Sequence, residues 1–249
     1  MPEIVVHNTE ELADMRKACQ LARDVLLYIE EYVTEGISTA ELDALCYTYI
    51  IEHGGESATL NYNGFPKSIC TSVNHVICHG IPGPYKLKSG DIINIDITVI
   101  LDGWHGDTSK TFLVGKCSKL AEELVKTAER ALFIGIEAVK PFGYFGDIGL
   151  AIQRFVSNTG FSIVQDYGGH GIGKIFHADP TVLHYNCREK REQILPGMFF
   201  TIEPMINVGS HKSKVLNDGW TVVTIDKSLS AQFEHTLAVT DHSVEILTL

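Results

Sequence analysis

The clearest pattern of hydrophobic and polar positions lies between residues 92 and 113, where two extended runs flank an Asp102-Gly103 pair. An Asp-Gly pair between alternating runs predicts a β-hairpin with a type I′ turn, because both central residues of that turn need a positive φ. Leu101 then pairs with Trp104. Since side chains alternate between the two faces of a strand, one face of the hairpin is predicted to be wholly apolar: Ile93, Ile95, Ile97, Val99 and Leu101.

The opposite face of the predicted hairpin is polar. It carries Asp96 opposite Ser109, with Asp107 on the adjacent diagonal. Diagonal neighbours lie about 7–8 Å apart at the backbone, so two such side chains can reach one ligand between them. From this stretch alone, a solvent-exposed polar face is as good an interpretation as a binding site, because ordinary antiparallel sheets alternate in the same way.

Helical periodicity predicts four helices. Apolar residues at helical spacing indicate one from about residue 9 to residue 33. Ser38 and Glu41 form a capping-box signature that begins a second helix, which should end near Gly54. A third is predicted over 120–139 and a shorter fourth over 147–157, with strands between and after them. No linker or low-complexity stretch interrupts this order, so residues 1–249 are expected to form a single domain.

Two short patterns occur twice, in the same order along the chain. The His-Gly-Ile of 79–81 recurs at 170–172, and the strand-like segment 90–96 resembles the segment 197–203. Each of these longer segments begins with a glycine and ends with an acidic residue. The repeat predicts two similar αβ halves related by a pseudo-twofold axis and folded face to face, so that their acidic strand faces meet.

Four carboxylates would converge between such halves, with His170 nearby: Asp96, Asp107, Glu203 and Glu234. They cannot share a small, partly dry space as free anions, because like charges disfavour joint ionisation. Two divalent ions would neutralise them, and oxygen ligands with one imidazole suit Mn, Co, Fe(II) or Zn. Two ions about 3.5–4 Å apart lower the pKa of a shared water, which then attacks a carbonyl or phosphoryl centre.

Composition limits the partners and the compartment. Of the 249 residues, 45% are hydrophobic and 20% are charged, as in ordinary globular proteins, and the net charge of −11 argues against a nucleic-acid partner. No apolar run approaches the about 20 residues that span a bilayer, and the start lacks the features of a signal peptide. Six cysteines without a CxxC pair indicate free thiols in a reducing compartment, so a cytoplasmic location is expected.

Several motifs in order along the chain together resemble the type I methionine aminopeptidases: CHGIP (78–82), NIDIT (94–98), HGDTSKTF (105–112), GGHGIG (168–173), FHADP (176–180), FTIEPM (200–205), DGWT (218–221) and EHT (234–236). The resemblance implies the α+β pita-bread fold, in which two pseudo-symmetric halves share a curved antiparallel sheet covered by helices. It also implies a metal-dependent methionyl aminopeptidase. Such a hydrolase removes the initiator methionine from nascent proteins when the second residue is small, through attack of a metal-activated water on the first peptide bond.

The resemblance assigns a role to each matching residue. Two metal ions would be held by Asp96, Asp107, His170, Glu203 and Glu234, with Asp107 and Glu234 bridging them. Glu203 would also shuttle a proton, His177 would stabilise the oxyanion, and His79 would contact the nitrogen of the scissile bond. The family's methionine pocket falls on Tyr62, Phe65, Cys70, Phe176 and Trp220, and an aromatic-lined hole suits an apolar, polarisable side chain.

The remaining histidines have a structural interpretation. His105 shares the polar hairpin face but lies close to the turn, and His235 is expected to point to the opposite side of the sheet from Glu234. Ordinary surface or core positions are expected for the others: His7, His53, His184, His211 and His242. For Cys70, packing in a pocket wall is preferred over a chemical role.

Other interpretations stay open. A non-catalytic relative would typically have lost metal ligands, yet all five are present. Prolidases and creatinases share the fold but usually carry an added N-terminal domain, and only 78 residues precede His79. A dinuclear phosphoesterase would fit the carboxylates alone.

The expected partners are peptides and nascent proteins that begin with methionine, with transient proximity to the ribosome. A monomer is expected, and Met1 itself, which precedes Pro2, should be removed. The physiological metal is open, and Thr59 and Ala178-Asp179 depart from the family pattern and leave the tolerance for larger second residues open.

Overall fold

The predicted hairpin lies at the centre of the molecule. The computed structural model describes residues 4–249, and in it β4 (Ile92–Leu101) and β5 (Trp104–Leu113) pair in the predicted register, with Asp96 opposite Ser109. Asp102 and Gly103 have φ values of 51° and 81°, as a type I′ turn requires. The sequence therefore specifies both the turn and the register.

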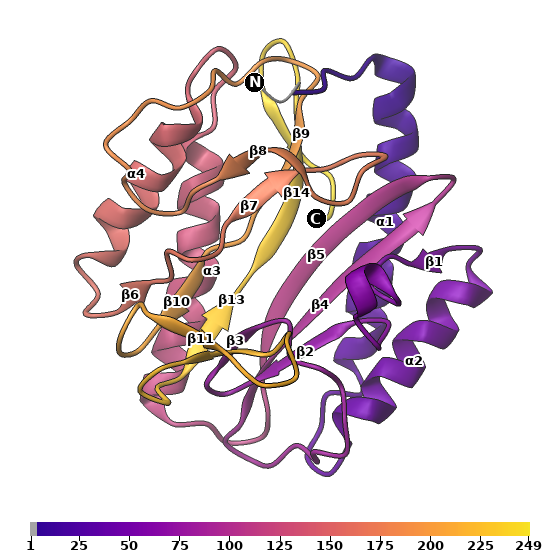
Figure 1. Cartoon of the computed structure of the whole chain (residues 1–249), viewed down its shortest axis with the longest axis vertical. Helices are drawn as coiled ribbons and strands as arrows, with labels where there is room; N and C mark the ends of the chain where they lie inside the picture. The colour runs from indigo at the N-terminus through magenta and orange to yellow at the C-terminus, as the bar shows by residue number, and fades with distance from the viewer. Residues whose placement is uncertain (1–3) are drawn as a thin grey trace.

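A nine-stranded antiparallel sheet extends from this hairpin in both directions (Figure 1). Its order within the described residues is β1 (Glu56–Ser57), β4, β5, β14 (Glu234–Val239), β9 (Phe199–Ile202), β7 (Gly169–Gly171) and β8 (Ala178–Val182). β2 (Cys70–Val73) also pairs with β4, and β15 (Val244–Ile246) with β14.

Two small three-stranded sheets accompany the large one. One has the order β13 (Ser230–Gln232), β10 (Met205–Asn207) and β6 (Ser162–Ile163). The other has the order β11 (Ser213–Val215), β12 (Val222–Thr224) and β3 (Val76–Cys78).

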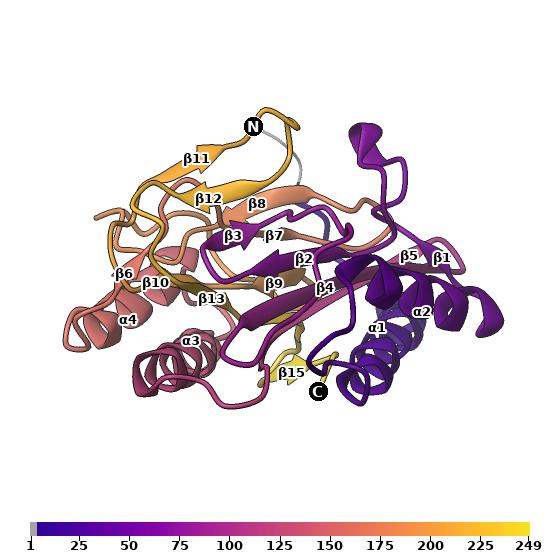
Figure 2. The ribbon, with the colours of Figure 1, turned by 90° about the horizontal axis from the view of Figure 1, so that it is seen from below.

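Within residues 4–249, four α-helices lie on one side of the large sheet (Figure 2). They are α1 (Thr9–Glu30), α2 (Thr39–Glu52), α3 (Lys119–Ala138) and α4 (Phe145–Val156), close to their predicted ranges, and a short 3₁₀ helix η1 (Tyr62–Gly64) follows β1. The Ser38–Glu41 capping box begins α2 as predicted. Among residues 4–249, no helix is both long enough and apolar enough to cross a membrane.

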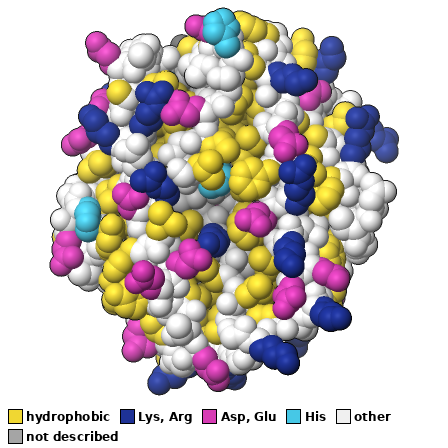
Figure 3. Space-filling model, turned by 180° about the vertical axis from the view of Figure 1, so that it is seen from behind, with side chains coloured by type: hydrophobic (Ala, Val, Ile, Leu, Met, Phe, Trp, Pro, Cys, Tyr) yellow, Lys and Arg dark blue, Asp and Glu magenta, His cyan; other side chains and the backbone are white. Residues whose placement is uncertain are grey.

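The core divides between the two halves of the sheet. The predicted apolar face of β4 packs on α1 and α2, and Ile93, Ile95, Ile97 and Val99 are fully buried there. A second cluster packs α3 and α4 against β9 and β14. Because the helices cover one side, the polar side of β4 and β5 remains available for a site. On the helix side, acidic and basic side chains are interspersed among the described residues (Figure 3).

The two halves join edge to edge, which corrects the expectation that they fold face to face. The order β4-β5-β14-β9 is symmetric about the β5–β14 pair, in which Glu234 lies opposite Ser109. The glycines that precede β4 and β9, Gly90 and Gly197, both have a positive φ, of 99° and 89°. Backbone pairing between the inner edges satisfies hydrogen bonds that a face-to-face arrangement would leave open. The acidic faces still meet, because both belong to one side of one sheet.

Candidate metal centre and its pocket

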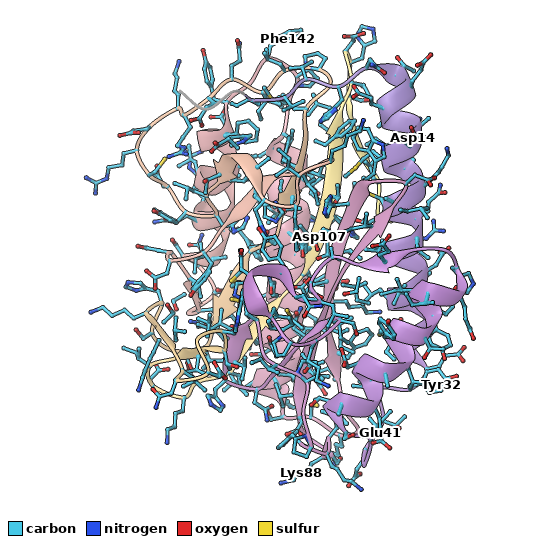
Figure 4. The ribbon with its side chains drawn as sticks, turned by 45° about the vertical axis from the view of Figure 1, so that its right-hand side comes forward. Asp14, Tyr32, Glu41, Lys88, Asp107 and Phe142 are labelled. Carbon is cyan, nitrogen blue, oxygen red and sulfur yellow. The ribbon has the colours of Figure 1, made fainter. Side chains whose placement is uncertain are left out.

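A cavity of about 190 Å³ lies over the polar side of the hairpin. Figure 4 shows Asp107 near the middle of the molecule, well inside the other labelled residues. The structure brings all twelve residues proposed for the site to the wall of this cavity: Tyr62, Phe65, Cys70, His79, Asp96, Asp107, His170, Phe176, His177, Glu203, Glu234 and Trp220. Thr59, Thr98, Tyr167, Gly168 and Met205 complete the lining.

The acidic side chains come from four neighbouring strands, the central pair β5 and β14 and the strands β4 and β9 that flank it. Asp96 lies on β4, Asp107 on β5, Glu234 at the start of β14, and Glu203 directly after β9. One ligand atom each from Asp107, His170 and Glu234 lies within 4.8 Å of the other two. The Nε2 atom of His170, on β7, is 3.7 Å from a carboxylate oxygen of Asp107 and 3.7 Å from one of Glu203.

Burial makes this group of acids costly to ionise. Only 3% of Asp107, 8% of Glu203 and 2% of Glu234 is exposed. Burial raises the pKa of Asp96 to about 7 and, despite hydrogen bonds from Thr201 and Gln232, that of Glu203 to about 8. Burial and then neighbouring carboxylates raise the pKa values of Asp107 and Glu234 well above the usual range. Divalent cations among these oxygens would offset the cost, so the donor set fits a metal centre.

The ring of His170 is arranged as a ligand. Its Nδ1 is 3.0 Å from the backbone oxygen of Gly171, which places the proton on Nδ1 and leaves the Nε2 lone pair facing the carboxylates. Burial lowers the pKa of His170 to about 4. The ring is therefore neutral near pH 7, as a metal ligand must be.

Polar residues behind the acids fix their orientation. The hydroxyl of Thr98 donates to Asp107 Oδ1 at 2.9 Å, and that of Thr201 donates to Glu203 Oε1 at 2.8 Å. The amide of Gln232 donates to Glu203 Oε2 at 3.1 Å. Sequence reasoning missed both Thr201 and Gln232. Strand alternation could have indicated Thr201, which lies two residues before Glu203, whereas Gln232 is 29 residues from Glu203 and reaches it only through the tertiary structure.

His184 was also missed as a supporting residue. It is buried as expected of a core position, but its Nε2 accepts a hydrogen bond from the backbone N–H of Glu203 at 3.1 Å. Burial lowers its pKa to about 3, so it stays a neutral acceptor. Because His184 precedes Glu203 by 19 residues and reaches it through a loop, no local pattern indicated this contact.

The repeated His-Gly pair has a steric cause. A side chain at Gly80 would overlap the backbone oxygen of Thr71, and one at Gly171 would overlap that of Asp179. Each glycine therefore lets a neighbouring backbone pass directly beside the histidine that precedes it. His79 itself has a φ of 55°, a left-handed conformation held by this packing.

Aromatic rings form the apolar part of the cavity. The rings of Phe65 and Trp220 meet edge to face at 5.2 Å, and those of Tyr62 and Phe176 are 4.9 Å apart. Cys70 lies opposite Asp96 in the β2–β4 pair, and its burial raises the pKa of its thiol well above the usual value. A protonated thiol suits a pocket wall rather than a nucleophile or a metal ligand.

Two further histidines lie outside this group. The Nδ1 of His235 is 2.8 Å from the hydroxyl of Thr248, on the opposite side of the sheet from Glu234, as predicted. The Nδ1 of His105 is 2.9 Å from the backbone oxygen of Gly173, and its ring lies parallel to that of Phe176. His105 therefore anchors the loop that carries Phe176 and does not line the cavity.

Comparison with known proteins identifies the family. The model of metallopeptidase family M24 matches residues 13–241. The chain belongs to metallopeptidase family M24. The family resemblance is thus confirmed, and the matched range contains every residue of the proposed metal centre.

Individual M24 proteins match over almost the whole chain. It is 52% identical to methionine aminopeptidase of Escherichia coli (strain K12) over 248 residues, which cover 99% of this chain and 94% of that one. It is 54% identical to methionine aminopeptidase A of Synechocystis over 247 residues, or 99% and 98% of the two chains. The crystal structure of methionine aminopeptidase from Rickettsia prowazekii superposes with a TM-score of 0.97 at 48% identity, over 99% and 100%. The pita-bread fold is confirmed.

Proposed function

We propose that this M24 chain is a methionyl aminopeptidase, a hydrolase that removes the initiator methionine from nascent proteins when the second residue is small. One observation carries the proposal: a buried cluster of four carboxylates and a neutral imidazole lies in the same cavity as an aromatic pocket. An apolar, polarisable side chain fits such a pocket, and relatives that are about half identical over the full length carry this name.

Two divalent ions, drawn from Mn, Co, Fe(II) and Zn, would be held by Asp96, Asp107, His170, Glu203 and Glu234. Asp107 and Glu234 would supply ligands from both halves of the fold, because they lie on the paired central strands β5 and β14. When bound, such ions polarise the carbonyl of the scissile bond and make a nearby water acidic.

The chain's own groups supply proton transfer and hydrogen bonds. Glu203 is suited to take a proton from the attacking water and to give it to the leaving amine, because hydrogen bonds from Thr201 and Gln232 hold its carboxyl in place at the centre of the site. We assign His177 to the oxyanion and His79 to the nitrogen of the scissile bond. Tyr62, Phe65, Cys70, Phe176 and Trp220 would enclose the methionine side chain.

The setting of the reaction follows from this substrate. We propose that the enzyme acts as a monomer on nascent chains near the ribosome. We place it in the cytoplasm, because all six cysteines are free and a reducing compartment keeps thiols in that state. The whole chain is proposed to act as one catalytic domain, because a single sheet contributes ligands from both halves. Met1, which precedes Pro2 and lies outside the described residues, is expected to be a substrate of the same activity.

Peptide hydrolysis by metal-stripped protein tests the proposal. Mn, Co, Fe(II) or Zn is added back in turn, and release of methionine is measured from peptides that begin Met-Gly and Met-Lys, with Asp107→Asn as the control variant. We expect metal-restored release from the Met-Gly peptide alone, abolished by the substitution. Bound metal without cleavage of either peptide would refute the proposed substrate.

A further inference from the structure

A hydrogen bond between Tyr62 and His177 crosses the cavity wall. The hydroxyl oxygen of Tyr62 is 2.8 Å from the Nδ1 atom of His177. The two residues are 115 positions apart: Tyr62 begins η1 in the first half, and His177 follows β7 in the second. The bond therefore links the two halves at a residue to which we assign a role in the reaction.

Apart from this bond, the contacts of the His177 ring recorded within residues 4–249 are with other aromatic rings. The His177 ring lies nearly parallel to the ring of Phe176 at 3.9 Å and beside that of His170 at 4.4 Å. Stacking fixes the plane of a ring, but it does not determine which nitrogen carries the proton. That choice depends on the hydrogen bond that the ring makes.

Tyr62 is positioned to determine which nitrogen of His177 carries the proton. Its segment is a tight turn, in which Asn61 and Asn63 have φ values of 67° and 47° and the N–H of Asn61 donates to the Phe65 oxygen at 2.8 Å. A phenol is a good donor and a poor acceptor, because its oxygen lone pair is delocalised into the ring. An unprotonated imidazole nitrogen is a good acceptor.

We propose that Tyr62 is a positioning residue, whose hydroxyl donates to Nδ1 and so holds His177 as the tautomer with its proton on Nε2. This inference rests on the proposed function, in which His177 must donate a hydrogen bond to the developing oxyanion. With Nδ1 occupied, Nε2–H is the donor that remains. The opposite tautomer would present a lone pair to an anion, which is repulsive.

Tyr62→Phe removes only the hydroxyl and keeps the aromatic wall of the pocket. We expect kcat for a Met-Gly peptide to fall about 10-fold to 100-fold, with KM within about threefold of the wild type, because the change acts on the transition state. Tyr47→Phe is the matched control. Tyr47 lies on α2, is 42% exposed and is not part of the cavity wall, so loss of its hydroxyl should leave kcat unchanged.

A double-mutant cycle separates positioning from a general structural effect. If Tyr62 acts through His177, adding Tyr62→Phe to His177→Ala causes no further loss of kcat. A purely structural role would make the two losses multiply. Wild-type kcat in Tyr62→Phe, or independent effects in the double variant, would overturn the inference.

The tautomer can also be observed without turnover. In ¹⁵N NMR spectra of histidine-labelled, zinc-loaded protein, we expect wild-type His177 to show a protonated Nε2 and a hydrogen-bonded, unprotonated Nδ1. Tyr62→Phe should show both tautomers. A wild-type proton on Nδ1 would refute the inference, even for active enzyme. Absence of methionine release from the wild type with every metal would refute the proposed function, while the spectrum would still decide the tautomer.

Discussion

The buried carboxylates make the stability of the metal-free protein depend on pH. Burial raises the pKa of Asp96 to about 7 and that of Glu203 to about 8, whereas in an unfolded chain both titrate near about pH 4. Between these values the folded state keeps protons that the unfolded state has released. Stability is therefore greatest below the unfolded-state pKa and is lost as the pH rises through the folded-state values.

The size of this loss follows from linkage. Between about pH 6.5 and about pH 8.5, it amounts to about 1 kcal/mol for Asp96 and about 2 kcal/mol for Glu203. Buried histidines act in the opposite direction. Burial lowers the pKa of His170 and His235 to about 4, so the free energy of unfolding falls when acid protonates these rings in the unfolded chain, and it is recovered once the pH rises past their unfolded-state pKa. A variant with Asp96→Asn and Glu203→Gln keeps the histidines and removes the two carboxyls. Its stability relative to the wild type should rise by about 3 kcal/mol over this range.

Urea unfolding of the chelator-treated proteins at the two pH values measures this difference. The metal-loaded wild-type protein provides a second comparison. Bound cations favour ionised carboxylates, so the loss of stability that these carboxyls cause between the two pH values should disappear. If the stability difference between variant and wild type stays constant across the range, the carboxyls ionise normally in the folded protein. That result would refute the argument that their crowding requires cations.

The remaining predictions concern the support of the site. Thr201→Val removes the hydroxyl that donates to Glu203. Since a hydrogen bond to a charged group is worth about 1.5–3 kcal/mol, metal affinity measured by calorimetry should fall about 10-fold or more. Gly171→Ala forces a side chain against a backbone oxygen, so we expect a loss of about 1–3 kcal/mol in thermal unfolding; unchanged stability would show that the backbone can relax there. Cys70 is buried, and the raised pKa of its thiol disfavours the thiolate, so iodoacetamide should label the partly exposed Cys187 first, as peptide mass mapping can show.

Local patterns predicted the elements of this fold well. Alternation and the Asp102-Gly103 turn gave the register of the central hairpin, and the Ser38–Glu41 capping box gave the start of α2. The repeated segments indicated two similar halves. The prediction of how these halves join was wrong. Face-to-face and edge-to-edge arrangements bring the same acids together, and only the backbone pairing of β5 with β14 distinguishes them.

The candidate site was predicted where its residues belong to strands or family motifs. All twelve line one cavity, but the contacts that hold them were only partly visible in the sequence. Thr201 follows from alternation around Glu203. His184 reaches Glu203 through a loop, and the bond from Tyr62 to His177 joins two halves, so both depend on tertiary structure that no local pattern encodes.

Diffraction from crystals soaked in manganese and methionine would test the central claim most directly. The account predicts two anomalous peaks about 3.5–4 Å apart, among Asp96, Asp107, His170, Glu203 and Glu234. It also predicts the methionine thioether against the aromatic wall that contains Phe65 and Trp220. Manganese bound elsewhere, or methionine bound outside this cavity, would contradict the account.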